Sequence, residues 1–122
     1  MFLRTLFLSA CFSAGMAVAA CADLTLVMVE EKGCFWCAKW NKEISHIYPK
    51  TPEGQAAPLR RHDIRADPPD DLNFARRLSF TPTFVLMREG TELSRIEGYP
   101  GEDFFWGLLR QMIDAADQTV VN

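Results

Sequence analysis

The sequence predicts an α/β fold whose elements run in the order β-α-β-α-β-β-α and build a mixed four-stranded sheet. Three observations predict it. Residues 24–30 are an unbroken apolar run rich in β-forming residues, as expected for a strand buried on both faces. A helical repeat and a second strand follow, and such a β-α-β unit implies parallel strands with a right-handed crossover. A strand-turn-strand pattern and an amphipathic helix then close the chain and add an antiparallel pair.

The first helix is predicted to begin at Cys34 and to end before Pro49. Apolar side chains recur through it at helical spacing, with charged residues on the other faces. The apolar positions are Cys37, Trp40, Ile44 and Ile47. Proline ends the helix because its ring clashes with the preceding turn. Residues 51–58, with two prolines and a glycine, are expected to form a loop, and residues 59–64 the second strand.

The second half is predicted to hold a short helix, two strands and a long helix. The short helix spans residues 72–78, after an acidic segment suited to the positive end of a helix. A strand over residues 80–86, entered through a proline, turns at Glu89-Gly90-Thr91 into a return strand over residues 92–97. Residues 102–116 repeat apolar side chains at helical spacing, which predicts the covering helix.

Residues 1–22 are predicted to be a secretory signal peptide, and residues 23–122 a single domain. Arg4 precedes an apolar stretch, and small residues close the segment before Asp23. This is the layout of a signal peptide. The alternative is an uncleaved membrane anchor. The apolar stretch is shorter than a membrane-spanning helix needs and is rich in small residues, which counts against it. We therefore expect export to the periplasm.

Two cleavage sites fit this end of the chain. Ala20-Cys21-Ala22 follows the A-x-A rule and would make Asp23 the first mature residue. Residues 18–21 also resemble a bacterial lipobox, which would attach lipid to Cys21. The first strand is predicted to begin at residue 24, so lipid on Cys21 would hold the fold against the bilayer almost without a tether. Soluble secretion is favoured, and lipid anchorage remains the alternative.

The composition counts against a nucleic-acid-binding protein and against a disordered chain. The formal net charge is -3 and the sequence has no basic run, which counts against a nucleic-acid-binding function. Hydrophobic residues make up 48% and charged residues 24%, the balance of a globular rather than a disordered chain. Cleavage after Ala22 would leave only Cys34 and Cys37 as cysteines, in an oxidising compartment.

Cys34-Phe35-Trp36-Cys37 stands where the first strand hands over to the first helix. Side chains three residues apart share one helical turn, so the two sulfurs can close a small disulfide ring. Cys34 would lie at the helix N-terminus, where free amides and the helix dipole stabilise a thiolate, while Cys37 belongs to the buried stripe. We predict Cys34 to be the attacking nucleophile and Cys37 the resolving thiol of thiol-disulfide exchange.

Two other interpretations of the cysteine pair stay open. A purely structural disulfide would gain little from a ring this short. Half of a zinc site is the second, but zinc prefers four ligands and only His46 and His62 remain, one expected on a solvated helix face and one in a strand. We therefore expect no metal and no cofactor.

Further motifs resemble the thioredoxin superfamily. Thr81-Pro82, entering an apolar strand well past the cysteines, resembles the cis-proline loop of that superfamily. A trans proline at a strand start is the alternative. The resemblance also rests on residues 34–40, 48–51, 80–84 and 97–106, and covers nearly the whole mature chain. It is strongest for the small periplasmic thioredoxins encoded with bacterial sulfur-oxidation genes.

The resemblance implies a thioredoxin-like fold and a thiol-disulfide oxidoreductase with a dithiol mechanism. It also implies that the proline loop lies beside the cysteines and that the exposed backbone of Thr81 pairs with a substrate strand. The implied activity is that of a reductant that clears disulfides from a cysteine-bearing partner, the sulfur-carrier protein of a thiosulfate-oxidising system. An upstream thiol-disulfide reductant, which could be membrane-bound, would restore the dithiol. We expect a monomer.

Other functions would use the same residues. A disulfide oxidase or isomerase differs from a reductant in its reduction potential, although an isomerase usually needs a dimerisation segment and none is visible. A non-catalytic module that senses redox state through the cysteines is a further alternative. A glutaredoxin-like protein is another, but the motif lacks the proline and tyrosine typical of glutaredoxins.

The sequence departs from ordinary thioredoxins at two places. Met28 stands where they carry a buried aspartate that assists proton transfer, and Glu30 or Glu31 is a candidate replacement, although solvated turn acids are the simpler interpretation. Phe35 and Trp36 replace the usual Gly-Pro between the cysteines. Both cannot be core at the start of a helix, so at least one is expected to dock an apolar partner surface. Arg60 and Arg61 are expected to form a solvated edge, with the alternative that one of them brings positive charge towards the thiolate.

Overall fold

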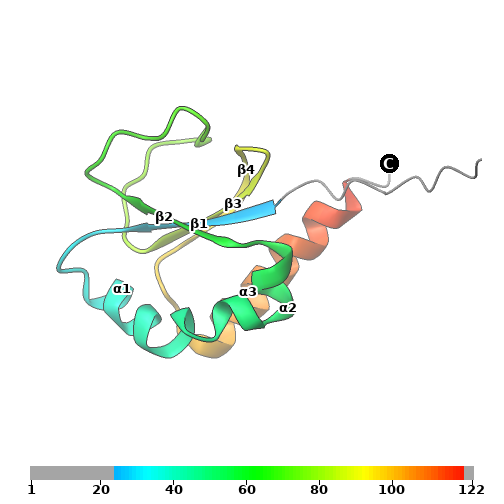
Figure 1. The fold of residues 1–122 in the computed structure, drawn as a ribbon, viewed down its shortest axis with the longest axis horizontal. Helices are drawn as coiled ribbons and strands as arrows, with labels where there is room; N and C mark the ends of the chain where they lie inside the picture. The colour runs from blue at the N-terminus through cyan, green and yellow to red at the C-terminus, as the bar shows by residue number, and fades with distance from the viewer. Residues whose placement is uncertain (1–23, 120–122) are drawn as a thin grey trace, which may run out of the picture.

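The computed structural model describes residues 24–119, which build a four-stranded sheet around the strand β1 (Leu24–Glu30). The sheet order is β2-β1-β3-β4 (Figure 1). The other strands are β2 (Leu59–Asp63), β3 (Thr83–Arg88) and β4 (Thr91–Glu97). β1 runs parallel to β2 and antiparallel to β3, and β3 and β4 form an antiparallel hairpin. The predicted mixed sheet is confirmed.

The central position of β1 explains its continuous apolar sequence. Leu26 and Met28 face the helical side of the sheet and are fully buried there. Val27 and Val29 are equally buried on the opposite face. A strand covered on both faces cannot afford alternating polar residues, so a run of apolar side chains is what this place in the sheet requires.

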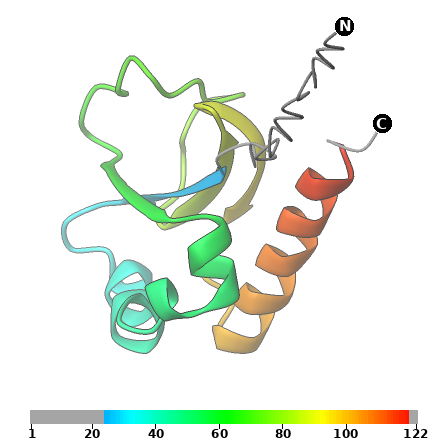
Figure 2. The same cartoon turned by 45° about the vertical axis from the view of Figure 1, so that its right-hand side comes forward.

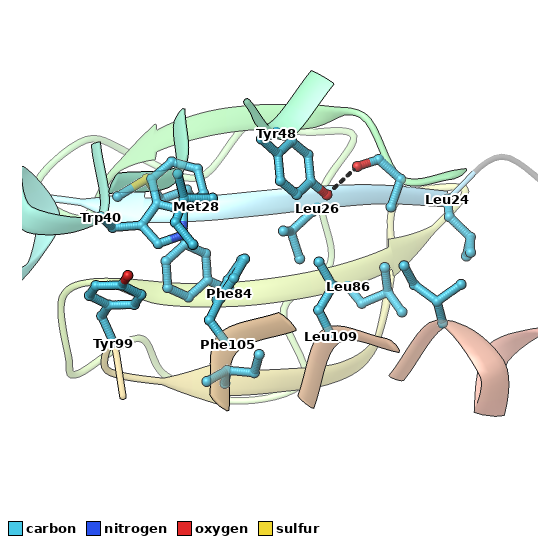
Figure 3. Packing of buried hydrophobic residues seen from close by; sticks show 14 of the residues in the cluster. Leu24, Leu26, Met28, Trp40, Tyr48, Phe84, Leu86, Tyr99, Phe105 and Leu109 are labelled. Atoms are coloured by element: carbon cyan, nitrogen blue, oxygen red, sulfur yellow. Dashed lines mark hydrogen bonds between the residues drawn. The ribbon is translucent and has the colours of Figure 1, made fainter. Parts of the chain in front are cut away.

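The helices cover one face of the sheet, and an irregular segment covers the other (Figures 1 and 2). The helical elements are α1 (Phe35–Trp40), the π-helical turn η1 (Asn41–Ser45), the 3-10 turn η2 (Tyr48–Lys50), α2 (Pro52–Ala56) and α3 (Glu102–Gln118). Trp40, the last residue of α1, is fully buried, and its ring centre lies 5.2 Å from that of Phe84 and 5.8 Å from that of Phe105 (Figure 3).

The prediction of one continuous helix from Cys34 to Pro49 is wrong in its second half. The π-helical turn η1 follows α1, and Pro49 lies inside the 3-10 turn η2. The wider π turn rotates the following side chains, so that Tyr48 rather than Ile47 points into the core. Tyr48 then donates its hydroxyl hydrogen bond to the carbonyl of Ala57 at 2.6 Å (Figure 3).

Residues 51–58, expected to form a loop, contain the short helix α2. The Thr51 hydroxyl caps this helix by accepting a hydrogen bond from the Gly54 amide at 3.0 Å, and Pro52 occupies its first position. Threonine before proline is a common way to begin a helix, so the signal was present in the sequence.

The short helix predicted over residues 72–78 does not form, and this corrects the predicted element order. The backbone of Asn73 instead pairs with the β3–β4 hairpin, donating to the Gly90 carbonyl at 2.7 Å and accepting from the Glu92 amide at 3.1 Å. Leu72 is buried on the face opposite the helices, and Phe74 and Leu78 pack there too. Tertiary contacts of the backbone and of apolar side chains therefore outweigh the helical propensity of the segment.

The strands of the hairpin also begin at other residues than predicted. β3 starts at Thr83 rather than residue 80, and β4 starts at Thr91 rather than residue 92. None of the helices within residues 24–119 has the length and apolar character that crossing a bilayer requires. The proposed signal peptide, residues 1–22, and its Cys21 lie outside the described residues.

Candidate redox site

Three connecting segments meet at one end of the sheet. Val29 near the end of β1 pairs with Thr83 at the start of β3, and Thr83 pairs with Glu97 at the end of β4. The chain that leaves β1 towards Cys34, the chain that enters β3 through Thr81-Pro82 and the chain that leaves β4 therefore all lie at this end. The Gly98 amide donates to the Pro82 carbonyl at 2.7 Å and ties the last two segments together.

Cys34 and Cys37 form a disulfide, with their Cα atoms 5.2 Å apart. Cys34 caps α1 and is half-buried, and its Sγ accepts a hydrogen bond from the Cys37 amide at 3.1 Å. Cys37 is only 3% exposed and belongs to the core on the helical side of the sheet. One sulfur can thus be reached from solvent beside helix amides, while the other is covered, which is the asymmetry that an attacking and a resolving thiol need.

The Thr81-Pro82 peptide bond is cis, as predicted from the sequence. Pro82 is buried and Thr81 is half-buried. The Thr83 hydroxyl donates to the Phe80 carbonyl at 2.6 Å and holds the turn that precedes β3. The role of Thr81 and Pro82 in binding a substrate stays a prediction.

Phe35 and Trp36 are exposed, at 70% and 50%, and their rings meet edge to face at 5.1 Å. Phe35 also lines an open hollow of about 490 Å³ together with Lys39 and Lys42 on the outer side of the helix. Two large apolar side chains beside the cysteines therefore face solvent, which is the surface that their proposed docking role requires.

Two further exposed aromatic residues were missed by the sequence reasoning. Phe80, 57% exposed, precedes the cis peptide bond, and Phe104, 71% exposed, lies in the first turn of α3. The prediction of a strand from residue 80 places Phe80 in the sheet, whereas β3 begins only at Thr83. Phe104 lies outside the apolar stripe of α3. A large aromatic residue on the polar face of a helix indicates an exposed apolar surface, and the sequence contains this signal.

Met28, which stands at the position of the usual aspartate, is fully buried in the same core as Cys37. Its sulfur accepts a contact from the Arg61 guanidinium at 3.5 Å. Arg61 also donates to Asn41 at 2.9 Å, and its guanidinium lies 5.9 Å from the centre of the Trp40 ring. Arg61 is exposed, as expected, but its guanidinium is held by these contacts instead of being free in solvent.

Glu30 and Glu31, the candidate proton acceptors, are both paired with arginines. Glu30 binds Arg61 at 2.6 Å, and Glu31 binds Arg65 at 2.6 Å. A carboxylate neutralised by a guanidinium opposes a nearby thiolate less than a free one does. These two acids are therefore not uncompensated negative charges.

Glu43, in η1, connects Lys39 of α1 to Tyr99 in the loop after β4. The Lys39 ammonium, 2.5 Å away, holds the pKa of the Glu43 carboxyl below its usual range. The Tyr99 hydroxyl donates to the same carboxylate at 3.1 Å. Burial, together with Glu43, raises the pKa of Tyr99.

Within residues 24–119, no three His, Cys, Asp or Glu side chains gather in a way that could hold a metal ion. His62 is buried against the Phe74 ring, with the ring centres 5.8 Å apart. Its neighbour in the sheet, Val29, belongs to the face opposite the helices, whereas Cys37 lies on the helical face. His62 therefore does not join the cysteines as a ligand.

Comparisons with known proteins agree with this geometry. The model of the thioredoxin-like domain family matches residues 16–113. The solved structure of reduced periplasmic thioredoxin SoxS from Paracoccus pantotrophus is 52% identical, with a TM-score of 0.75 over 76% of this chain and 98% of that one.

A thioredoxin from Malassezia sympodialis is only 14% identical, with a TM-score of 0.56 over 75% of this chain and 79% of that one, and supports the fold alone. A search of curated proteins found no match. The family model covers well over half of the chain, and SoxS is aligned over almost its full length. The chain belongs to the thioredoxin-like family.

Proposed function

We propose that the protein is a periplasmic thiol-disulfide oxidoreductase that acts as a reductant of a cysteine-bearing partner protein. The observation that carries the proposal is the unequal setting of Cys34 and Cys37. Cys34 lies at the N-cap of α1, where its sulfur accepts a hydrogen bond from a helix amide, and Cys37 is buried one turn later. Membership of the thioredoxin-like family supports the same chemistry.

The proposed reaction is a two-step exchange. In the reduced protein, the Cys34 thiolate attacks one sulfur of the partner disulfide, and the other partner sulfur leaves as a thiolate. Cys37, deprotonated, then attacks the Cys34 sulfur, releases the partner as a thiol and closes the Cys34–Cys37 disulfide. Two electrons have passed from the dithiol to the partner. An upstream reductant must then return two electrons to the disulfide before the next cycle.

The partner would bind at the end of the sheet where the three segments meet. Phe35 and Trp36 offer an exposed apolar surface beside Cys34. Thr81, before the cis bond to the buried Pro82, offers backbone groups to an extended partner segment. Exposed Phe80 extends the apolar surface on the side of this loop. Backbone pairing would supply general affinity, and the aromatic side chains would favour partners with apolar residues near the cysteine.

A sulfur-carrier protein of a thiosulfate-oxidising system is the proposed partner. Support comes from the 52% identity with periplasmic thioredoxin SoxS, which this chain covers over 98% of its length. The motifs 34–40 and 97–106 carry the same resemblance in the sequence. We further propose that residues 1–22 direct export and are removed after Ala22, and mass spectrometry of the mature protein would distinguish an Asp23 N-terminus from a lipidated Cys21.

The test is to trap the partner. In a Cys37→Ser variant the resolving thiol is gone, so the partner should stay bound to Cys34 as a mixed disulfide. The control is the same variant carrying Cys34→Ser as well, which should trap nothing. Recovery of one sulfur-carrier protein from periplasm supports the proposal. Many unrelated secreted proteins would indicate a general oxidoreductase, and none would favour the redox-sensing interpretation.

A further inference from the structure

Arg95 is a buried cation in β4, away from the cysteines. Its side chain is 3% exposed and binds the Glu92 carboxylate, itself 4% exposed, at 2.6 Å. A buried ion pair gains little net stability over apolar residues of similar size, because both charges lose their water. Stability alone therefore does not explain the ion pair, and Arg95 makes further contacts beyond Glu92.

The rest of the Arg95 guanidinium binds backbone. One terminal nitrogen donates to the Arg77 carbonyl at 3.2 Å and the other donates to the Arg76 carbonyl at 3.1 Å. The Arg76 side chain returns to β4 and binds Glu97 at 2.8 Å. These carbonyls belong to the segment that was expected to be a helix and is not. A planar guanidinium offers five donors in a fixed fork, which suits two carbonyls and a carboxylate at once, whereas an ammonium offers three donors from a single nitrogen.

This segment leads directly to the proposed partner-binding loop. Only three residues separate Arg77 from Thr81, so the position of one limits the position of the other. The downstream end of the loop is held by the hydrogen bond from Gly98 to the Pro82 carbonyl, at 2.7 Å. Both ends of the loop are therefore fastened to β4 or the residue after it, the upstream end through Arg95.

We propose that Arg95 is a positioning residue for partner binding: it holds the chain at Arg76 and Arg77 so that Thr81 presents its backbone to an extended partner segment. The proposal rests on the proposed function. It does not place Arg95 in contact with the partner or the sulfurs. Loss of Arg95 should therefore slow exchange with an extended substrate and leave exchange with a small disulfide unchanged.

The test compares two substrates with the same leaving group. The full mature protein is reduced with dithiothreitol and freed of it. The release of thionitrobenzoate is then followed from an extended peptide whose cysteine carries that group, and from the symmetric nitrobenzoate disulfide. The Cys34 thiolate attacks the peptide sulfur, or one sulfur of the small disulfide, and thionitrobenzoate leaves. Cys37 then attacks the Cys34 sulfur and closes the disulfide, which releases the peptide as a thiol or, from the small disulfide, a second thionitrobenzoate. Only the peptide can pair with the loop at Thr81.

Two variants remove the contact. Arg95→Lys keeps the charge and loses the fork. The double variant Glu92→Leu with Arg95→Met removes both charges, so no buried carboxylate is left unpaired. Arg88→Met is the matched control, because Arg88 also donates to a backbone carbonyl, that of Ala116, but at the other end of the sheet, opposite Leu24.

Both test variants should lose about tenfold or more in the rate constant for the peptide, since misplacing a binding group by about an ångström can cost up to a hundredfold. The rate constant for the small disulfide should stay unchanged, and the control should match the parent with both substrates. An unchanged peptide rate in either folded variant, or an equal loss with both substrates, would overturn the proposal. If the parent protein reacts with neither substrate, the proposed function fails and this inference fails with it.

Discussion

Cys34 and Cys37 are three residues apart but experience opposite surroundings. The Cys34 sulfur accepts a hydrogen bond from the Cys37 amide at the N-cap of α1, and Cys34 is only half-buried, so solvent can reach it. Helix amides stabilise a negatively charged sulfur at this place. Cys37 packs in the apolar core with Met28 and Trp40, where a charge is disfavoured. The local environment therefore supports the two proposed roles, Cys34 as the attacking thiol and Cys37 as the resolving thiol.

Alkylation of the reduced protein checks this difference. Iodoacetamide should modify Cys34 at a pH well below that needed for an ordinary exposed thiol, and should modify Cys37 slowly at any pH that keeps the protein folded. Peptide mapping after timed alkylation gives the two rates. Equal rates, or faster modification of Cys37, would remove the assignment of Cys34 as the nucleophile.

Tyr48, in η2, is buried in the core with its ring centre 6.2 Å from that of Trp40. Its buried hydroxyl donates to the Ala57 carbonyl at 2.6 Å. Tyr48→Phe leaves that carbonyl unpaired in the core, which should lower the free energy of unfolding by about 1–3 kcal/mol. Tyr99→Phe is the control: its acceptor Glu43 keeps Lys39 as a partner, so the loss should be smaller. Urea titrations of both variants measure the two losses, and a larger loss for Tyr99→Phe would contradict the account.

At the scale of elements, the strand of residues 24–30 could be predicted because a central strand needs apolar residues on both faces. Residues 72–78 could not, because their apolar side chains suit a helix as well as an irregular segment. The choice between them depends on partners distant in the sequence, such as Arg95 and the hairpin backbone. The π turn after α1 likewise leaves little trace in the spacing of apolar residues.

The same distinction holds for the candidate site. Cys34 and Cys37 are recognisable because their chemistry depends on a local motif at a strand-to-helix junction. The exposure of Phe80 depends instead on where β3 begins, and the apolar pattern predicts that start three residues too early. The position of the Arg61 guanidinium depends on hydrogen bonds to Glu30 and Asn41, and these residues come together only when the sheet and the helical layer pack.

The turn between β3 and β4 makes an element-scale prediction. Gly90 has a φ of +80°, and a Cβ there would collide with the Asp71 carbonyl. Gly90→Ala should therefore lower the free energy of unfolding by about 1–3 kcal/mol, because the left-handed backbone and the collision both oppose a side chain. Gly107, inside α3, has open space around it. Gly107→Ala should raise stability by about 0.5–1 kcal/mol. The prediction is wrong if both variants shift thermal unfolding in the same direction.

At the scale of the whole molecule, ion pairs tie separate elements together. Arg110 of α3 binds Glu53 of α2 at 2.6 Å and, by donating a hydrogen bond, holds the pKa of the Glu53 carboxyl below its usual value of 4.5. A carboxyl whose pKa is lower in the folded state stabilises the fold above its unfolded pKa, and that contribution disappears as pH falls through the folded value.

Unfolding measured from pH 7 downwards should therefore show stability falling below about pH 4.5. Arg110→Gln should reduce stability at pH 7 by less than about 1 kcal/mol, because Arg110 is largely exposed, and should make the acid loss shallower. Arg110→Lys should retain part of the effect. An acid loss that is equally steep with Arg110→Gln would show that this pair is not among its causes.

The measurement that tests the central claim most directly is the reduction potential of the Cys34–Cys37 pair. The protein is equilibrated with mixtures of oxidised and reduced glutathione or dithiothreitol, and the fraction of disulfide is determined by alkylation. A reductant requires a value closer to about -270 mV, as in thioredoxin, than to about -120 mV, as in strong disulfide oxidants, each tenfold in the equilibrium being about 30 mV. The account predicts a reversible couple near the first value. A couple near the second value, or cysteines that do not exchange at all, would contradict it.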